Sequence, residues 1–165
     1  MYIIDGHNLI GSGRVPGIHL AQEDDEWRLV QWLRARQPRL RQPLVVVFDS
    51  GVPGGQSQAL SGGGVTVIFA AQRRHHADQV IFARVREALV RSDITVVTND
   101  AVLREAVTAL GAQTLTVDAF LARLQKASKR KPKGRMQRPQ PEPKLPKSEV
   151  EEWLALFEQR QEGNA

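Results

Sequence analysis

The chain has no cysteine among its 165 residues. Disulfides, thiolate zinc sites and cysteine nucleophiles are therefore excluded, and this composition is typical of a cytosolic protein, so we expect a cytoplasmic location. No apolar run approaches the roughly 20 residues that span a bilayer, and no basic stretch followed by a long apolar stretch opens the chain. We therefore expect neither a membrane partner nor a secretory signal. The hydrophobic fraction of 41% is enough for one ordinary core.

The net charge of +5 is spread unevenly along the chain. Residues 1–125 carry 13 Lys+Arg and 12 Asp+Glu, residues 126–147 carry 9 and 1, and residues 148–165 carry 1 and 5. The composition of 126–147 is basic and rich in proline, with little to bury, which predicts a disordered linker. We expect a folded domain over 1–125, this basic linker over 126–147, and a C-terminal amphipathic helix over 148–165, where Ser148 and Glu151 match a capping box.

Short apolar runs alternate with segments of helical period in the first 125 residues. The runs 2–4, 44–48, 65–69, 95–97 and 114–117 read as buried strands, because they are short and rich in Val, Ile and Thr. Helices are predicted over 23–36, 78–90, 101–110 and 118–125, the third closed by Gly111 as a left-handed cap. This alternation predicts an α/β fold with a mostly parallel sheet and helices on both faces. The glycine-rich stretch 51–64 is predicted to be a mobile loop.

Aspartates follow several of the predicted strands. Asp5 ends the first strand, Asp49 ends the second, and Asp100 ends the fourth, directly after Thr98 and Asn99. Asp78 begins a helix that follows a strand, which places it on the same edge. In an open parallel sheet, ligands bind outside the carboxyl ends of the strands. We therefore expect these four acids to converge at one edge.

Several carboxylates held close together raise one another's pKa unless a cation lies among them. Mg²⁺ or Mn²⁺ suits such a cluster, because both prefer oxygen ligands and retain waters. Acids at strand ends with a divalent cation are typical of phosphoryl transfer or phosphodiester hydrolysis, since the metal polarises the phosphate and lowers the pKa of a bound water. On this interpretation Gly6 lets the backbone turn close to the phosphate, and Asn8 contacts a phosphate oxygen or orients an acid or a water.

Each aspartate also has a structural interpretation. A single aspartate after a strand is usually a turn former or a helix N-cap, and Asp118 fits that role. Asp78 and Asp100 could equally cap the helices that they begin. The convergence of four acids on one edge, itself inferred from the predicted topology, favours the functional interpretation.

Four motifs in this order, "YIIDGHNLI", "VVVFDS", "HHADQVI" and "VVTND", resemble those of the YacP-like NYN domain family. NYN domains are relatives of PIN-domain nucleases, and the resemblance covers about residues 1–125. It implies a PIN-like three-layer α/β/α sandwich and a Mg²⁺- or Mn²⁺-dependent endoribonuclease. Carried over position by position, the acidic metal site is Asp5, Asp78 and Asp100, the extra acid is Asp49, the first-motif asparagine is Asn8, and the polar neighbours of the last acid are Thr98 and Asn99.

Two features depart from the family pattern. His7 stands where an aromatic residue such as tyrosine is more usual, and the long basic tail with its helix is additional. Neither removes a carboxylate, so they bear on substrate choice rather than on activity. The resemblance also implies RNA as the partner, whether mRNA, rRNA or tRNA, with the ribosome as a candidate partner.

Basic residues next to Asp78 and in the linker are candidates for contacting RNA phosphates. Arginine suits that contact by its fork geometry, and a flexible basic chain binds a polyanion by releasing counterions, without sequence preference. The linker lacks interleaved aromatics, so base stacking is not expected there. A solvated basic loop and a solubilising linker remain the alternatives. The candidates are Arg73, Arg74, His76, Lys129, Arg130, Lys131, Lys133 and Arg135.

Our first hypothesis is therefore a metal-dependent endoribonuclease that hydrolyses RNA phosphodiester bonds. The alternative is a non-catalytic RNA- or ribosome-binding module that keeps the fold; the complete acid set favours the enzyme. A phosphatase with a nucleophilic aspartate is disfavoured, because such enzymes usually carry a second acid two residues on and His7 occupies that position. The catalytic candidates are Asp5, Asn8, Asp49, Asp78, Thr98 and Asp100.

Overall fold

The computed structural model describes residues 1–49, 54–70 and 76–129, in which six strands form one sheet in the order β3-β4-β2-β1-β5-β6. The strands are β1 (Tyr2–Asp5), β2 (Leu44–Phe48), β3 (Gly55–Gln56), β4 (Val65–Phe69), β5 (Thr95–Val97) and β6 (Gln113–Leu115). All pairs are parallel except β3 with β4. The predicted mostly parallel sheet is confirmed. The edge strand β3 lies within the predicted glycine-rich loop and is absent from the prediction, because two residues show no period.

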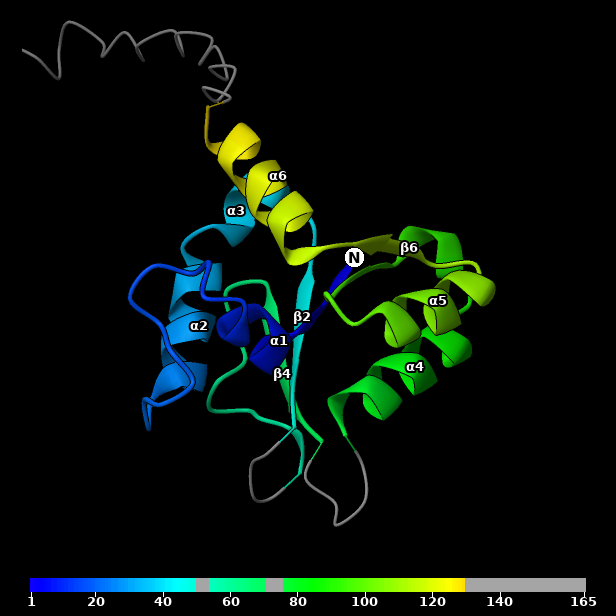
Figure 1. Ribbon diagram of the computed structural model, residues 1–165, viewed down its shortest axis with the longest axis horizontal. Coiled ribbons are helices and arrows are strands. Elements are labelled where there is room, and N and C mark those ends of the chain that lie inside the picture. Colours follow the sequence, from blue (N-terminus) through cyan, green and yellow to red (C-terminus); the bar gives the residue numbers. More distant parts are fainter. Residues whose placement is uncertain (50–53, 71–75, 130–165) are drawn as a thin grey trace, which may run out of the picture. The chain divides into compact units, whose positions relative to one another are not determined.

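Helices cover both faces of this sheet (Figure 1). They are α1 (Gly6–Gly11), α2 (Asp25–Arg34), α3 (Gln37–Leu40), α4 (Ala77–Glu87), α5 (Ala101–Ala109) and α6 (Val117–Lys129), with a 3-10 turn η1 (Arg91–Asp93) before β5. Helices α4 and α5 lie on one face, while α1 and α2 lie on the other. The expected PIN-like α/β/α sandwich is therefore present.

The core is divided in two by the sheet, because successive strand residues point to opposite faces. In β1, Ile4 packs in the cluster that includes α1, α2 and α6, whereas Ile3 packs in the cluster beneath α4 and α5. Both side chains are fully buried. Strands apolar on both faces need helices on both sides, which is why short continuous runs of Val and Ile predicted this architecture.

Gly6, expected to let the backbone turn near a phosphate, has a packing role in this structure. It is the first residue of α1, and a Cβ built there would lie 2.3 Å from Cε1 of Phe48. The Phe48 ring is fully buried, so the missing side chain lets α1 pack directly on the end of β2. Gly111 has a φ of 94° after α5, as expected for a left-handed cap.

The last described helix differs from its prediction at both ends. It begins at Val117, and the Thr116 Oγ1 accepts a hydrogen bond from the amide of Ala119 at 3.2 Å, so Thr116 rather than Asp118 provides the N-terminal cap. Asp118 instead pairs with Arg14 at 3.3 Å. The helix continues beyond residue 125 to Lys129. The rest of the predicted linker and the predicted helix over 148–165 lie outside the described residues.

No helix in the described part of the chain is both long enough and apolar enough to cross a bilayer.

Candidate active site

Asp5, Asp49 and Asp100 follow strands β1, β2 and β5 on one edge of the sheet, which we call the acidic edge. This edge includes the point where the chain reverses its direction of winding. From β1 the chain passes to β2 and β4 on one side, and then returns to β5 and β6 on the other side of β1. In doubly wound sheets, the crevice at such a switch point binds the ligand. Asp5 ends β1, and Thr98 follows β5 directly, so both lie at this switch point.

Asp5 is held by hydrogen bonds on both carboxylate oxygens. Oδ1 accepts from the amide of Asn8 at 3.1 Å, which makes Asp5 the N-cap of α1, and Oδ2 accepts from the Thr98 hydroxyl at 3.2 Å. Burial raises the pKa of the Asp5 carboxyl, and the negative charge of Asp49 acts in the same direction, although the two hydrogen bonds oppose the shift. The site therefore contains a partly desolvated carboxylate whose charged form is disfavoured.

Asn8 connects α1 to the loop after β5, so its side-chain oxygen is already engaged at this edge. Its Oδ1 accepts a hydrogen bond from the amide of Asn99 at 2.8 Å, and the Oδ1 of Asn99 accepts from the amide of Val117 at 3.0 Å. This relay ties α1 to the loop after β5 and to the start of α6. Asn99 thus has a structural role that its place in the motif did not specify.

Asp49 follows β2 and lies next to the Asp5 end of the sheet. Its Oδ1 accepts a hydrogen bond from the amide of Ala77, the first residue of α4, at 2.7 Å. Its Oδ2 lies 3.5 Å from Nδ1 of His7, and its own amide donates to that same nitrogen at 3.2 Å. Asp49 therefore fixes both the start of α4 and the ring of His7.

Asp78 and Asp100 lie at the N-terminal ends of α4 and α5, the two helices that cover one face of the sheet. Asp78 is in the first turn of α4, where its Oδ1 accepts from the amide of Gln79 at 2.9 Å. Asp100 is the N-cap of α5 and accepts from the amides of Val102 and Leu103 at 2.8 Å and 3.0 Å. Both acids line one cavity of about 610 Å³ between these helices.

The capping interpretation is therefore correct for Asp100. Asp100 caps α5 and also lies at the acidic edge. Thr98 links the two parts of that edge, because its Oγ1 donates to Asp5 and accepts from the amide of Asp100 at 3.1 Å. The structure thus brings Asp5, Asn8, Asp49 and Thr98 into one connected set, with Asp78 and Asp100 on the adjoining cavity.

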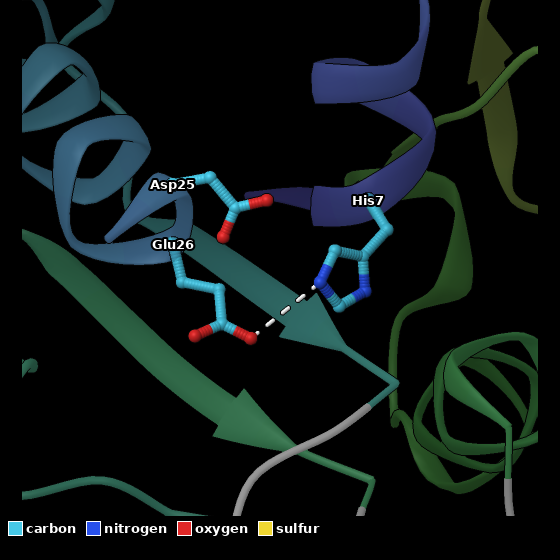
Figure 2. A group of neighbouring side chains, drawn as sticks. All are labelled: His7, Asp25 and Glu26. Atoms are coloured by element: carbon cyan, nitrogen blue, oxygen red, sulfur yellow. Dashed lines mark ion pairs between the residues drawn. The ribbon is translucent and has the colours of Figure 1, made fainter. Parts of the chain in front are cut away.

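A second group of possible metal ligands lies nearby. Among the described residues, His7, Asp25 and Glu26 each offer a ligand atom, and these atoms all lie within 4.8 Å of one another (Figure 2). Asp5, Asp78 and Asp100 do not meet at this spacing. The sequence prediction did not include Asp25 or Glu26, since they begin a helix far from any strand end; the only signal was the run of acids at 23–26.

Most of the predicted RNA contacts lie outside the described residues: Arg73, Arg74, Arg130, Lys131, Lys133 and Arg135. His76 is described, and it occupies the exposed N-cap position of α4 beside Asp78. Lys129 is the last residue of α6. The structure thus places one of these candidates, His76, next to the acidic edge.

Comparison with known proteins agrees with this architecture. Two crystal structures of Rae1 (YacP) from Bacillus subtilis share the fold: one is 23% identical, covering 99% of this chain and 95% of that one with a TM-score of 0.62. The other, of a tryptophan-to-leucine variant, is 21% identical, covering 78% and 77% with a TM-score of 0.59. No curated protein matches the chain. The family model of the YacP-like NYN domain matches residues 2–158. The chain therefore belongs to the YacP-like NYN domain family, whose fold is nuclease-like.

Proposed function

We propose that this chain is a cytoplasmic endoribonuclease that hydrolyses RNA phosphodiester bonds with the help of Mg²⁺ or Mn²⁺. The observation that carries the proposal is the state of Asp5. Its carboxylate is partly buried at the switch point of the sheet, its pKa is raised by that burial, and Asp49 adds further negative potential. A carboxylate in that position is stabilised by a cation, and family membership favours a nuclease.

The donor set fits a magnesium-type ion. Asp5, Asp78 and Asp100 offer carboxylate oxygens, the ligand type that Mg²⁺ prefers. Their oxygens do not all lie within 4.8 Å of one another, and Mg²⁺ usually takes one or two carboxylates directly, so the remaining acid would contact the ion through its retained waters. These three residues would hold the ion. When bound, such an ion neutralises charge on the phosphate and supplies a water of lowered pKa.

The remaining residues position these ligands. Thr98 donates to one oxygen of Asp5 and the Asn8 amide donates to the other, so the carboxylate is fixed in orientation. Asp49 fixes the start of α4 and therefore the turn that carries Asp78. His76, exposed at the N-cap of the same helix, lies where it can contact an RNA phosphate. A site of this kind is preorganised, because its side chains are already held by hydrogen bonds.

The substrate class follows from charge as well as from family. Residues 126–147 carry nine Lys+Arg and one acid, a composition that binds a polyanion through counterion release. We propose mRNA in a ribosome-linked context as the first target to test, with rRNA and tRNA as comparisons.

The test is a cleavage assay with end-labelled RNA and purified full-length chain. We expect internal cuts with Mg²⁺ or Mn²⁺, none after EDTA, and loss of cleavage in Asp5→Asn. Glu87→Gln is the matched control, because Glu87 is an exposed acid at the opposite end of α4 from Asp78. Tight RNA binding without metal-dependent cleavage by the unmodified protein, with or without ribosomes, would instead indicate a binding module.

A further inference from the structure

Three side chains from two helices converge outside the acidic edge. His7 comes from α1, and Asp25 and Glu26 come from the first turn of α2 (Figure 2). Nε2 of His7 lies 3.5 Å from Oε1 of Glu26, and the ligand atoms of all three residues lie within 4.8 Å of one another. The three residues form a compact set of one nitrogen and two oxygen donors.

Asp25 shows that this set is more than a helix end rich in acids. Its neighbour Asp24 pairs with Arg28 at 2.8 Å, and Glu26 pairs with His7. Asp25 itself is only 7% exposed, yet its carboxylate has no hydrogen bond or ion pair with any described residue. In Figure 2 its carboxylate is directed towards the space between His7 and Glu26. A largely buried carboxylate without a partner is costly, and a bound cation would offset that cost.

An ion has access to these oxygens. In the described part of the chain, no fully buried side-chain oxygen lacks a hydrogen-bond partner. Because Asp25 has no such partner, its oxygens must keep some contact with solvent. Acids in the first turn of a helix are also favoured by the helix dipole. The dipole alone does not explain why Asp25, the acid without a hydrogen-bond partner, is also the buried acid of this turn.

We propose that His7, Asp25 and Glu26 bind one divalent transition-metal ion, Zn²⁺ or Mn²⁺, at a site separate from Asp5, Asp78 and Asp100. One imidazole with two carboxylates is a donor set that suits Zn²⁺ and Mn²⁺, whereas Mg²⁺ rarely accepts a histidine. Three protein ligands leave a fourth position for water or a phosphate oxygen. This proposal does not depend on the nuclease activity.

The geometry needs only a small contraction. Two ligands bound at about 2.0–2.1 Å to a tetrahedral ion lie roughly 3.3 Å apart. The His7–Glu26 pair, at 3.5 Å, is already close to this value, and Asp25 lies within 4.8 Å of the ligand atoms of both. The widest pair of ligand atoms therefore has to close by about 1.5 Å or less to reach the tetrahedral spacing.

The other nitrogen of His7 connects this site to the acidic edge. Nδ1 accepts from the Asp49 amide in this structure, so the ring proton is on Nε2. When a metal takes Nε2, that proton must be on Nδ1 instead, where the Asp49 carboxylate, 3.5 Å away, accepts it. A carboxylate behind a ligating histidine is the usual arrangement that orients the ring. Metal binding thus exchanges one hydrogen bond for another without changing the ring's charge.

The test is a titration of the untagged full-length protein with Zn²⁺ and with Co²⁺, read by calorimetry and by the visible absorption of bound Co²⁺. With excess Mg²⁺ present to occupy the acidic edge, we expect one Zn²⁺ or Co²⁺ ion per chain, with affinity lowered in Asp25→Asn and in His7→Gln by more than the roughly 10–100-fold that loss of a supporting residue costs. Asp25→Asn changes no volume, so its folding can be verified by an unchanged circular dichroism spectrum. A large excess of Mg²⁺ should not displace the ion.

Two further variants distinguish this site from others on the chain. Asp100→Asn should bind Zn²⁺ as the unmodified protein does, because it alters only the acidic edge. His76→Gln should also leave binding unchanged, because His76 belongs to α4 rather than to α1 or α2. The proposal is overturned if no ion binds, if binding is lost in either of these controls, or if it is insensitive to changes at both His7 and Asp25. None of these results bears on whether the chain cleaves RNA.

Discussion

Asp100 combines a structural and a proposed catalytic role, and two substitutions separate them. Its carboxylate accepts hydrogen bonds from the amides of Val102 and Leu103 at the start of α5, and the carboxylate is also a proposed metal ligand. Asparagine keeps an oxygen acceptor of the same shape and removes the charge. Alanine removes both. The amide of Asp100, which donates to Thr98, is present in all three proteins.

The expected magnitudes follow from these contacts. Asparagine and aspartate are about equal as N-caps, so Asp100→Asn should lose only the charge–dipole interaction, about 0.3–1 kcal/mol. Asp100→Ala should lose the cap in addition, typically ~1 kcal/mol. For a chain of this size each kcal/mol shifts the melting temperature by about 2–4 °C, so the alanine variant should melt about 2–4 °C below the asparagine variant. Loss of a carboxylate that holds the cation, which in turn stabilises the transition state, should lower cleavage in both by at least about 100-fold.

Thermal unfolding followed by circular dichroism, without divalent ions, measures the first effect, and the RNA cleavage assay measures the second. Equal melting temperatures for the two variants would refute the capping argument. Cleavage by Asp100→Asn at the rate of the unmodified protein would refute the role of the carboxylate in metal binding. The two readouts are independent, because asparagine retains the cap.

Three other predictions test separate parts of the structure. Gly6→Ala should lower the free energy of unfolding, measured in urea, by about 1–3 kcal/mol, because the new methyl group clashes with the buried Phe48 ring. The control Gly11→Ala should be nearly neutral, because its methyl group meets only the end of a flexible side chain. Equal effects of the two substitutions would contradict this. Burial raises the pKa of Asp5, so the folded state holds that proton more tightly than the unfolded state, and the free energy of unfolding falls as pH rises through the interval between the two pKa values. Metal-free Asp5→Asn should therefore melt at a higher temperature than the unmodified protein at pH 7 and lose this advantage in acid. A lower melting temperature for the variant at pH 7 would contradict this reasoning. Truncation after Lys129 removes seven of the nine basic residues of 126–147. It should weaken RNA binding and reduce the slope of log K against the logarithm of the salt concentration by up to about 5. An unchanged slope in a filter-binding assay would exclude the tail as an RNA contact.

The sequence predicted the sheet well because its signal is local. Five strands appear where short apolar runs placed them, and the alternation with helical segments was enough to infer parallel pairing. Short elements were missed for the same reason. Helix α1 follows β1 without a break, and its six residues are too few for a helical period to be visible.

The acidic edge was predictable in outline, because the carboxyl ends of parallel strands share one side of a sheet. Asp5 and Thr98 are in hydrogen-bond contact although 93 positions separate them. Their individual partners were not predictable. That Asn8 binds the amide of Asn99, or that Asp49 caps α4, depends on loop conformations that no periodicity encodes.

The amino-acid sequence by itself determined the family, the parallel sheet and the edge on which the acids gather, since these depend on residue type and order along the chain. Only the tertiary structure decided that Gly6 makes room for Phe48, and that His7 meets Asp25 and Glu26 beside the acidic edge. These contacts arise from the packing of α1 and α2 on the same face of the sheet. Packing depends on shapes and distances between elements that are remote in sequence, and the pattern within each element contains no record of them.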